Sequence, residues 1–137
     1  MADLVITATS VAPSATTKQE TGVAGEAITA GQVVYRDAST GKYGLADCDS
    51  ATAGHRSPVG IALHGAAANQ PLVIAKSGPM TLGATLTAGV AYYLSPTAGG
   101  VCPVADLGSG DYPVFLGFAT SAALLDVDIV EAGVALA

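Results

Sequence analysis

Charged side chains are scarce and tryptophan is absent in this chain of 137 residues. Charged residues make up 12% of it, about half of the usual share of roughly 25%. A surface that binds nucleic acid needs clustered cations to displace counterions from phosphates. Here five Lys/Arg are outnumbered by eleven Asp/Glu and are scattered, so we expect no direct contact with nucleic acid. The basic residues are Lys18, Arg36, Lys42, Arg56 and Lys76.

Cysteine is also rare, since only Cys48 and Cys102 occur and no Cys-x-x-Cys is present. In a chain made in the cytoplasm we expect two free, partly buried thiols. Aspartates flank Cys48, but neither histidine lies at metal-ligand spacing from it, and an Asp-rich turn explains the cluster better. We therefore expect no metal and no cofactor.

The motifs of the common catalytic sites are missing. The chain has no Gly-x-Ser-x-Gly, no Gly-x-x-x-x-Gly-Lys-Ser/Thr and no His-Glu-x-x-His. Gly108-Ser109-Gly110 is two thirds of a dinucleotide fingerprint without its helix. The sequence therefore predicts that the protein is not an enzyme.

Long apolar helices are excluded as well. Residues 77–105 carry no charge, but prolines, glycines and hydroxyl residues interrupt them, so we expect no membrane insertion. Met1-Ala2-Asp3 opens without a basic region before an apolar one, so no signal peptide is expected. We expect the chain to remain in the cytoplasm of the cell that makes it.

What the chain does have is an internal repeat with an offset of 58 positions. The phrase Ala27-Ile28-Thr29-Ala30-Gly31 returns as Thr85-Leu86-Thr87-Ala88-Gly89. Fainter matches extend it into two copies, about 26–78 and 84–133. These are Val33-Val34-Tyr35 with Ala91-Tyr92-Tyr93, Gly41 with Gly99, Ala46-Asp47 with Ala105-Asp106, Pro58-Val59 with Pro113-Val114, and Ser77-Gly78 with Ala132-Gly133. Because turn glycines and strand apolars recur and no catalytic residue type does, the repeat indicates a scaffold.

The spacing of short apolar runs between turns predicts an all-β fold, with one β-barrel or sandwich-like domain built from the two repeats. A single helical turn is expected within 46–56. The expected strands are 3–9, 32–37, 42–46, 57–64, 71–75, 80–86, 90–95, 100–105, 112–120 and 123–131.

The first 24 residues lie outside the repeat, and residues 25–137 form the duplicated domain. Leu4, Val5 and Ile6 make an apolar run, followed by a Ser/Thr/Ala/Pro stretch and a polar segment. This segment either adds a strand to its own barrel or reaches out to pair with a neighbour. The flexible composition of residues 10–22 favours an extended arm. We therefore expect Leu4, Val5 and Ile6 to contact a capsid or another subunit, and the barrel to fold without residues 2–20.

Several phrases resemble those of the capsid decoration (cement) proteins of tailed bacteriophages, from about residue 24 onward. They are Ala24-Gly25-Glu26-Ala27-Ile28-Thr29-Ala30-Gly31-Gln32-Val33-Val34-Tyr35, Gly60-Ile61-Ala62-Leu63 with Gly65-Ala66-Ala67 and Gln70-Pro71, and Gly83-Ala84-Thr85-Leu86-Thr87-Ala88-Gly89 through Tyr93-Leu94-Ser95. The resemblance implies a small β-rich virion protein, often a homotrimer. Such a protein binds the outer surface of the expanded head and ties neighbouring subunits of the major capsid protein together.

The apolar share of 50% independently favours self-association, because it exceeds what one small core needs. The alternative is that alanine and glycine raise the apolar count without forming exposed patches, and the oligomeric state distinguishes the two. Alternative functions are a tail or baseplate component, or a host-surface binding module. A carbohydrate binder usually shows clustered aromatics, whereas this chain has no tryptophan and its tyrosines fall in strand positions.

Overall fold

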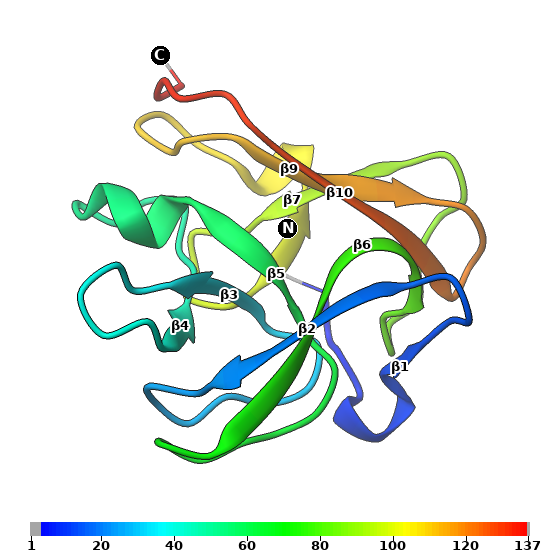
Figure 1. Ribbon diagram of the computed structural model, residues 1–137. Helices are drawn as coiled ribbons and strands as arrows, with labels where there is room; N and C mark the ends of the chain where they lie inside the picture. Colours follow the sequence, from blue (N-terminus) through cyan, green and yellow to red (C-terminus); the bar gives the residue numbers. More distant parts are fainter. Residues whose placement is uncertain (1–3, 137) are drawn as a thin grey trace.

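The structure, a computed structural model, describes residues 4–136 as an all-β domain whose antiparallel sheet curls into a half-barrel (Figure 1). The strands are β1 (Ala12–Pro13), β2 (Lys18–Val23), β3 (Val33–Arg36), β4 (Tyr43–Leu45), β5 (Pro58–Ala62), β6 (Pro71–Thr81), β7 (Ala91–Leu94), β8 (Val101–Pro103), β9 (Val114–Ala119) and β10 (Leu124–Glu131). Three short 3-10 helices complete the described chain: η1 (Ala8–Ser10), η2 (Ala53–Arg56) and η3 (Val104–Asp106).

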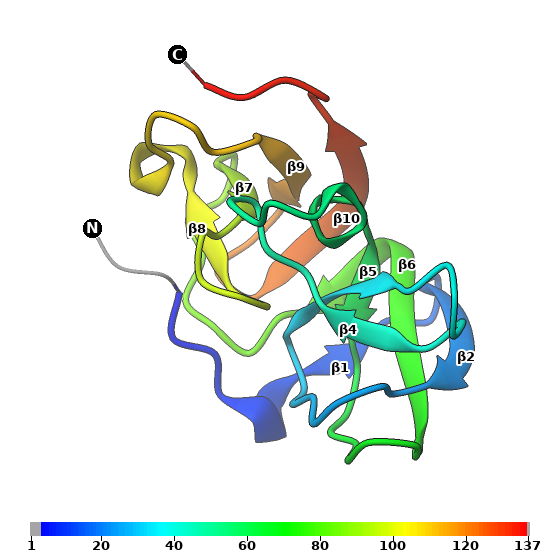
Figure 2. The same cartoon turned by 90° about the vertical axis from the view of Figure 1, so that its left-hand side faces the viewer.

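The sheet path is β4-β3-β5-β6-β10-β9-β7-β8, with β1 and β2 pairing on β6. The long strand β6 joins two parts of the molecule, which lie at the lower right and the upper left of Figure 2. Its beginning pairs with β5 and β2, and its end pairs with β10 and β1. We call β3, β4, β5 and residues 71–77 the first unit, and β7 to β10 the second unit.

The two units share one pairing pattern. Val34 lies opposite Leu45 in the first hairpin, and Tyr92 lies opposite Pro103 in the second. Each residue of the second pair lies 58 positions after its counterpart in the first pair. Each hairpin then pairs with the next strand, and the register shifts after Val34 in one unit and after Tyr92 in the other. The turns before the hairpins also correspond, since Gly31 has φ +88° and Gly89 has φ +84°.

The later part of the sequence alignment needs correction. Pro58 lies opposite Tyr35, and Phe115 lies opposite Tyr93. Pro58 therefore corresponds to Phe115, two positions beyond the match with Pro113 that the sequence indicated. The sequence match was misled because Pro-Val also occurs in the loop just before β9.

Most predicted strands occur at or near their expected positions, but the N-terminal segment differs. Residues 4–7 of the predicted strand 3–9 are not a strand, and residue 3 lies outside the described residues. Lys18–Val23, expected in the tether, is the strand β2, which pairs along the first half of β6. The predicted strands 71–75 and 80–86 are replaced by the single strand β6, which ends at Thr81.

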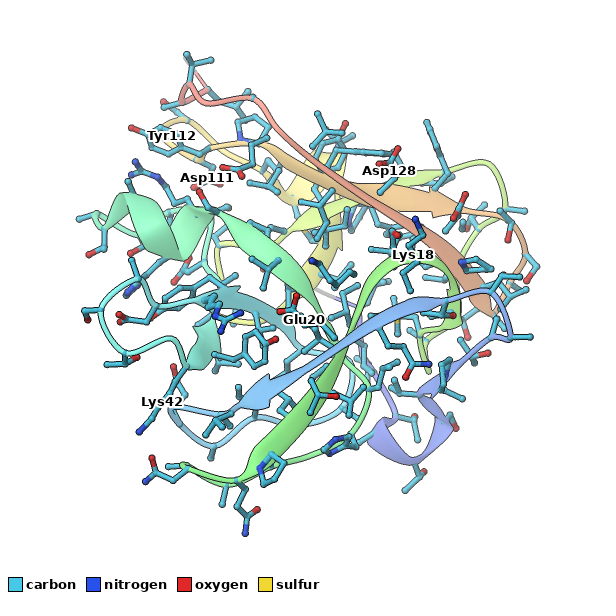
Figure 3. All side chains as sticks on the ribbon, in the orientation of Figure 1. Lys18, Glu20, Lys42, Asp111, Tyr112 and Asp128 are labelled. Atoms are coloured by element: carbon cyan, nitrogen blue, oxygen red, sulfur yellow. The ribbon has the colours of Figure 1, made fainter. Side chains whose placement is uncertain are left out.

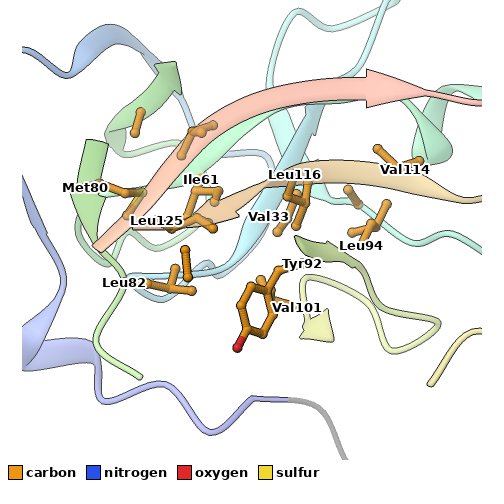
Figure 4. Packing of buried hydrophobic residues seen from close by; sticks show 14 of the residues in the cluster. Val33, Ile61, Met80, Leu82, Tyr92, Leu94, Val101, Val114, Leu116 and Leu125 are labelled. Carbon is orange, nitrogen blue, oxygen red and sulfur yellow. The ribbon is translucent and has the colours of Figure 1, made fainter. Parts of the chain in front are cut away.

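Two apolar clusters form the core. The smaller cluster lies within the first unit and is closed by Ala24, which bridges to Tyr43 of β4. The larger cluster lies between the two units and holds buried side chains from both (Figure 4). The labelled members in that view include Val33, Ile61, Leu94, Leu116 and Leu125.

Candidate functional site

The predicted contact residues Leu4, Val5 and Ile6 lie against their own domain in the described chain. The backbone N–H of Leu4 donates to the carbonyl of Val101 at 2.9 Å. Leu4 and Ile6 are half-buried and pack on the larger core cluster, whereas the side chain of Val5 is 87% exposed. Of the three, Val5 alone therefore offers most of its side chain to a partner.

Ile6 is held closely by the first repeated turn. A Cβ added to Gly31 would lie 2.5 Å from Cγ2 of Ile6, a distance that side chains do not tolerate. The next residue, Thr7, donates its N–H to the carbonyl of Gly83 at 2.8 Å. The segment that sequence composition favoured as a free arm is thus fitted to glycine positions of its own domain.

A charged group covers the outer end of the first unit, next to β2. Glu20 on β2 lies 3.5 Å from Arg36 and 3.0 Å from Lys76, measured between carboxylate oxygen and nitrogen. The hydroxyl of Tyr43 donates to Oε1 of Glu20 at 2.6 Å. Val59 is half-buried beside the smaller core cluster. We call Glu20, Arg36, Val59 and Lys76 the charged end; Figure 3 labels Glu20 on β2.

These contacts perturb both titrating partners. The hydrogen bond from Tyr43, followed by the one from Lys76, lowers the pKa of Glu20 below its usual value. Burial raises the pKa of Tyr43 far above its usual value, and Glu20 adds to that shift. At neutral pH the ionised carboxylate of Glu20 therefore accepts a hydrogen bond from the neutral phenol of Tyr43.

Aromatic side chains gather on the outer surface of the second unit. The ring centroids of Tyr93 and Phe115 lie 5.9 Å apart, and those of Phe115 and Phe118 lie 5.0 Å apart. Val130 lies directly opposite Phe115, and Asp126 lies opposite Phe118. Phe118 and Val130 are 54% and 55% exposed. We call Tyr93, Phe115, Phe118, Asp126 and Val130 the aromatic face.

Sequence reasoning assigned the tyrosines to the core, which is confirmed for Tyr35, Tyr43 and Tyr92, but it missed this face. The signal was present in β9, where Phe115 and Phe118 flank Leu116 and Gly117. Regular alternation would place these two phenylalanines on opposite faces of the sheet. The shifted register beside Gly117 brings both to the outer surface.

The remaining candidate side chains have structural partners. His55 stacks on Tyr35 with ring centroids 4.4 Å apart, and Nε2 of His64 accepts the N–H of Val73 at 3.0 Å. Asp111 accepts the N–H of Gly108 at 2.8 Å. Asp111 and its neighbour Tyr112 lie in the loop before β9 (Figure 3). These contacts orient loops, and none of them aligns a nucleophile with a base.

One contact ties the two units together beside this loop. The guanidinium carbon of Arg56 lies 3.7 Å from the ring centroid of Tyr112, a cation–π geometry. Next to it, the hydroxyl of Ser57 donates to Glu131 at 2.8 Å. Both pairs join the η2 region of the first unit to the second unit, so we assign them to stability of the domain.

The region around Cys48 is also structural. Cys48 and Cys102 are fully buried thiols that are not joined in a disulfide, and burial raises the pKa of the Cys48 thiol to about 12. Burial and the neighbouring Asp49 raise the pKa of Asp47 to about 6. A thiol with such a pKa is a poor nucleophile at neutral pH, because the thiolate is the reactive form.

Across residues 4–136, no three His, Cys, Asp or Glu side chains are grouped so that they could hold a metal ion. No helix in that range is long and apolar enough to cross a membrane. Among the described residues, the exposed features that suit a macromolecular partner include the aromatic face, the charged end and the N-terminal segment around Val5. In comparisons with known proteins, no protein-family model matches the chain and no curated protein matches it.

Proposed function

We propose that the protein is a structural virion component that binds the outer surface of an expanded phage capsid and stabilises contacts between major capsid protein subunits. The observation that carries the proposal is the set of repeated phrases resembling capsid decoration proteins. They occupy the turns at Gly31 and Gly89 and the strands that follow. They therefore form the framework of the fold.

The surface chemistry supports the same proposal. A clamp between capsid subunits needs exposed apolar contacts on a rigid scaffold, and it needs no reactive group. Val5 is exposed on a segment that is itself fixed to the domain by Leu4 and Ile6. Ordering the segment in advance lowers the entropic cost of binding. We assign the capsid contact to this segment, centred on Val5.

The energetic role follows from linkage. A protein that binds the expanded lattice and has no affinity for its precursor stabilises the expanded state by mass action. Assembly into a homotrimer or another closed oligomer would raise the effective concentration of each further contact. Many individually weak contacts would then resist the outward pressure of packaged DNA.

The test is binding of fluorescently labelled protein to purified particles of the phage that encodes it, assembled without this protein. We expect saturable binding to expanded heads and little binding to unexpanded precursors, tails or host cells. Bound heads should release their DNA at a higher temperature than bare heads. Preferential binding to tails or to cells would overturn the proposal in favour of a tail component or a host-surface module.

Two variants locate the contact. Val5→Asp should reduce head occupancy without changing the melting temperature, because the side chain makes little contact with its own domain. Val134→Asp is the matched control, since Val134 is 67% exposed and lies far along the chain in the C-terminal segment. Equal loss of binding in both variants would show a nonspecific effect of the added charge.

A further inference from the structure

The contact between the two units inside the chain joins two different faces. The first unit contributes one side of its strands to the larger core cluster, and the second unit contributes the opposite side. On the first unit these residues are Val33, Tyr35, Ile61 and Ala75. On the second unit they include Leu94, Leu116 and Val127. Figure 4 shows Val33 next to Leu116 and Ile61 next to Leu125. The two units therefore pack through different faces, as in a heterologous, head-to-tail contact.

The shared register identifies where parts of the same two faces recur exposed to solvent. Tyr35 corresponds to Tyr93 within the hairpins, and Ile61 corresponds to Phe118 on the third strand of each unit. Ile61 is fully buried by the second unit, whereas Phe118 is 54% exposed. The aromatic face is thus the second unit's copy of the surface that, on the first unit, is covered.

The surface of the second unit that faces the core also has a counterpart on the first unit. Leu94 corresponds to Arg36 at the end of each hairpin strand, and Val127 corresponds to Lys76 on the fourth strand. Leu94 and Val127 are buried against the first unit. The side chains of Arg36 and Lys76 are 53% and 48% exposed. The charged end is therefore the open part of the first unit's copy of the surface that is buried on the second unit. The rest of that copy, which includes Val34 and Ile74, is covered within the smaller core cluster.

The two open surfaces have complementary charge. The charged end carries Arg36 and Lys76 against the single carboxylate of Glu20. The aromatic face carries Asp126 directly beside Phe118, and Asp128 follows on the same side of β10. Guanidinium groups also stack favourably on aromatic rings. The charged end therefore offers cations, and the aromatic face offers carboxylates and aromatic rings that attract them. Such complementarity is typical of a specific interface.

We infer that the aromatic face of one copy docks onto the charged end of a second copy, repeating between chains the contact that joins the two units within the chain. Because the two surfaces differ, the contact is heterologous, and each copy retains one open surface of each kind. Copies then add to one another, and they form a ring where the rotation between neighbours closes. This inference names the contact behind the self-association in the proposed function, but it does not depend on capsid binding.

The test uses sedimentation of the full-length protein alone. Wild type should form a closed oligomer, and Phe118→Asp should weaken association by about tenfold or more, as expected for an aromatic anchor. Lys76→Glu should weaken it from the other side, and Lys76→Gln is a milder second variant in case the charge reversal affects folding. Val134→Asp serves as the control outside both surfaces, and melting curves verify that each variant is folded.

Mixing provides the decisive measurement. Each of the two variants Phe118→Asp and Lys76→Glu keeps one intact surface, so a mixture should form a one-to-one dimer although neither variant associates alone. A monomeric wild type, unchanged association of the folded Phe118→Asp variant, or a mixture that stays monomeric would each overturn the inference. Capsid binding is measured separately, so its failure would contradict the proposed function and leave this result standing.

Discussion

At the scale of single residues, two corresponding glycines beside the register shifts are constrained by backbone atoms of the neighbouring strand. A Cβ on Gly60 would lie 2.5 Å from the carbonyl oxygen of Ala75. A Cβ on Gly117 would lie 2.0 Å from the carbonyl oxygen of Asp126, which occupies the corresponding strand position. In both units the neighbouring backbone fills the space that any side chain would need. These glycines therefore fix how closely the third and fourth strands approach.

Replacing Gly117 tests this close approach. Gly117→Ala should destabilise the fold by about 3 kcal/mol, because backbone atoms must move to admit the methyl group. Differential scanning calorimetry should show a melting temperature lower by roughly 10 °C. Gly54→Ala is the matched control, since a Cβ there meets no atom within 4 Å. Equal melting temperatures for the two variants would contradict the proposed constraint.

The pKa shift of Glu20 gives a second residue-scale prediction. Because its pKa is lowered in the folded state, ionised Glu20 stabilises the fold above its unfolded pKa of about 4.3. That contribution is lost as the pH falls through the lower, folded pKa. Glu20→Gln should cost about 1 kcal/mol at pH 7, discounted because Arg36 and Lys76 are about half exposed. Urea unfolding at several pH values measures this cost, which should shrink below pH 4. A cost that does not change with pH would show that packing, not charge, stabilises this position.

At the scale of elements, sequence patterns predicted the hairpins well because their turns carry glycines at required positions and their strands carry apolar runs. The strand β2 escaped prediction because Lys18-Gln19-Glu20-Thr21-Gly22 has neither feature. Its pairing with β6 is established by tertiary contacts that no local pattern records. The aromatic face escaped for a related reason, since a register shift decides which side Phe118 occupies. The sequence nevertheless located Leu4, Val5 and Ile6 as an apolar segment outside the repeat.

Deleting residues 2–20 tests whether the N-terminal segment is a dispensable arm or a structural part of the domain. The sequence alone predicts that the barrel folds without them, but the structure leads to the opposite expectation. The deletion removes the first half of β2 and the packing of Leu4 and Ile6 on the core. We expect the melting temperature to fall by about 10 °C or more. Val5→Ser should melt like the wild type, because Val5 is 87% exposed. An unchanged melting temperature after the deletion would show that the segment is a dispensable arm.

At the scale of the whole molecule, one strand holds the two units together and one core lies between them. The strand β6 pairs with the first unit at its beginning and with the second unit at its end. The larger core cluster takes side chains from both units. Neither unit can therefore keep its packed face covered alone. The described chain therefore forms one domain with three separate outer features: the aromatic face, the charged end and the segment around Val5.

This separation predicts different binding defects for variants at two of these features. If oligomers bind heads through several Val5 segments, Phe118→Asp should require roughly a hundredfold higher concentration for half-maximal occupancy, because avidity is lost. Its occupancy at saturation should remain close to that of the wild type. Val5→Asp should instead weaken each capsid contact while leaving the oligomer intact in sedimentation. Titration of labelled protein onto empty expanded heads measures both, with Val134→Asp as the control. If Phe118→Asp binds at wild-type concentrations, attachment does not depend on self-association, and single copies must hold the lattice by contacts of their own.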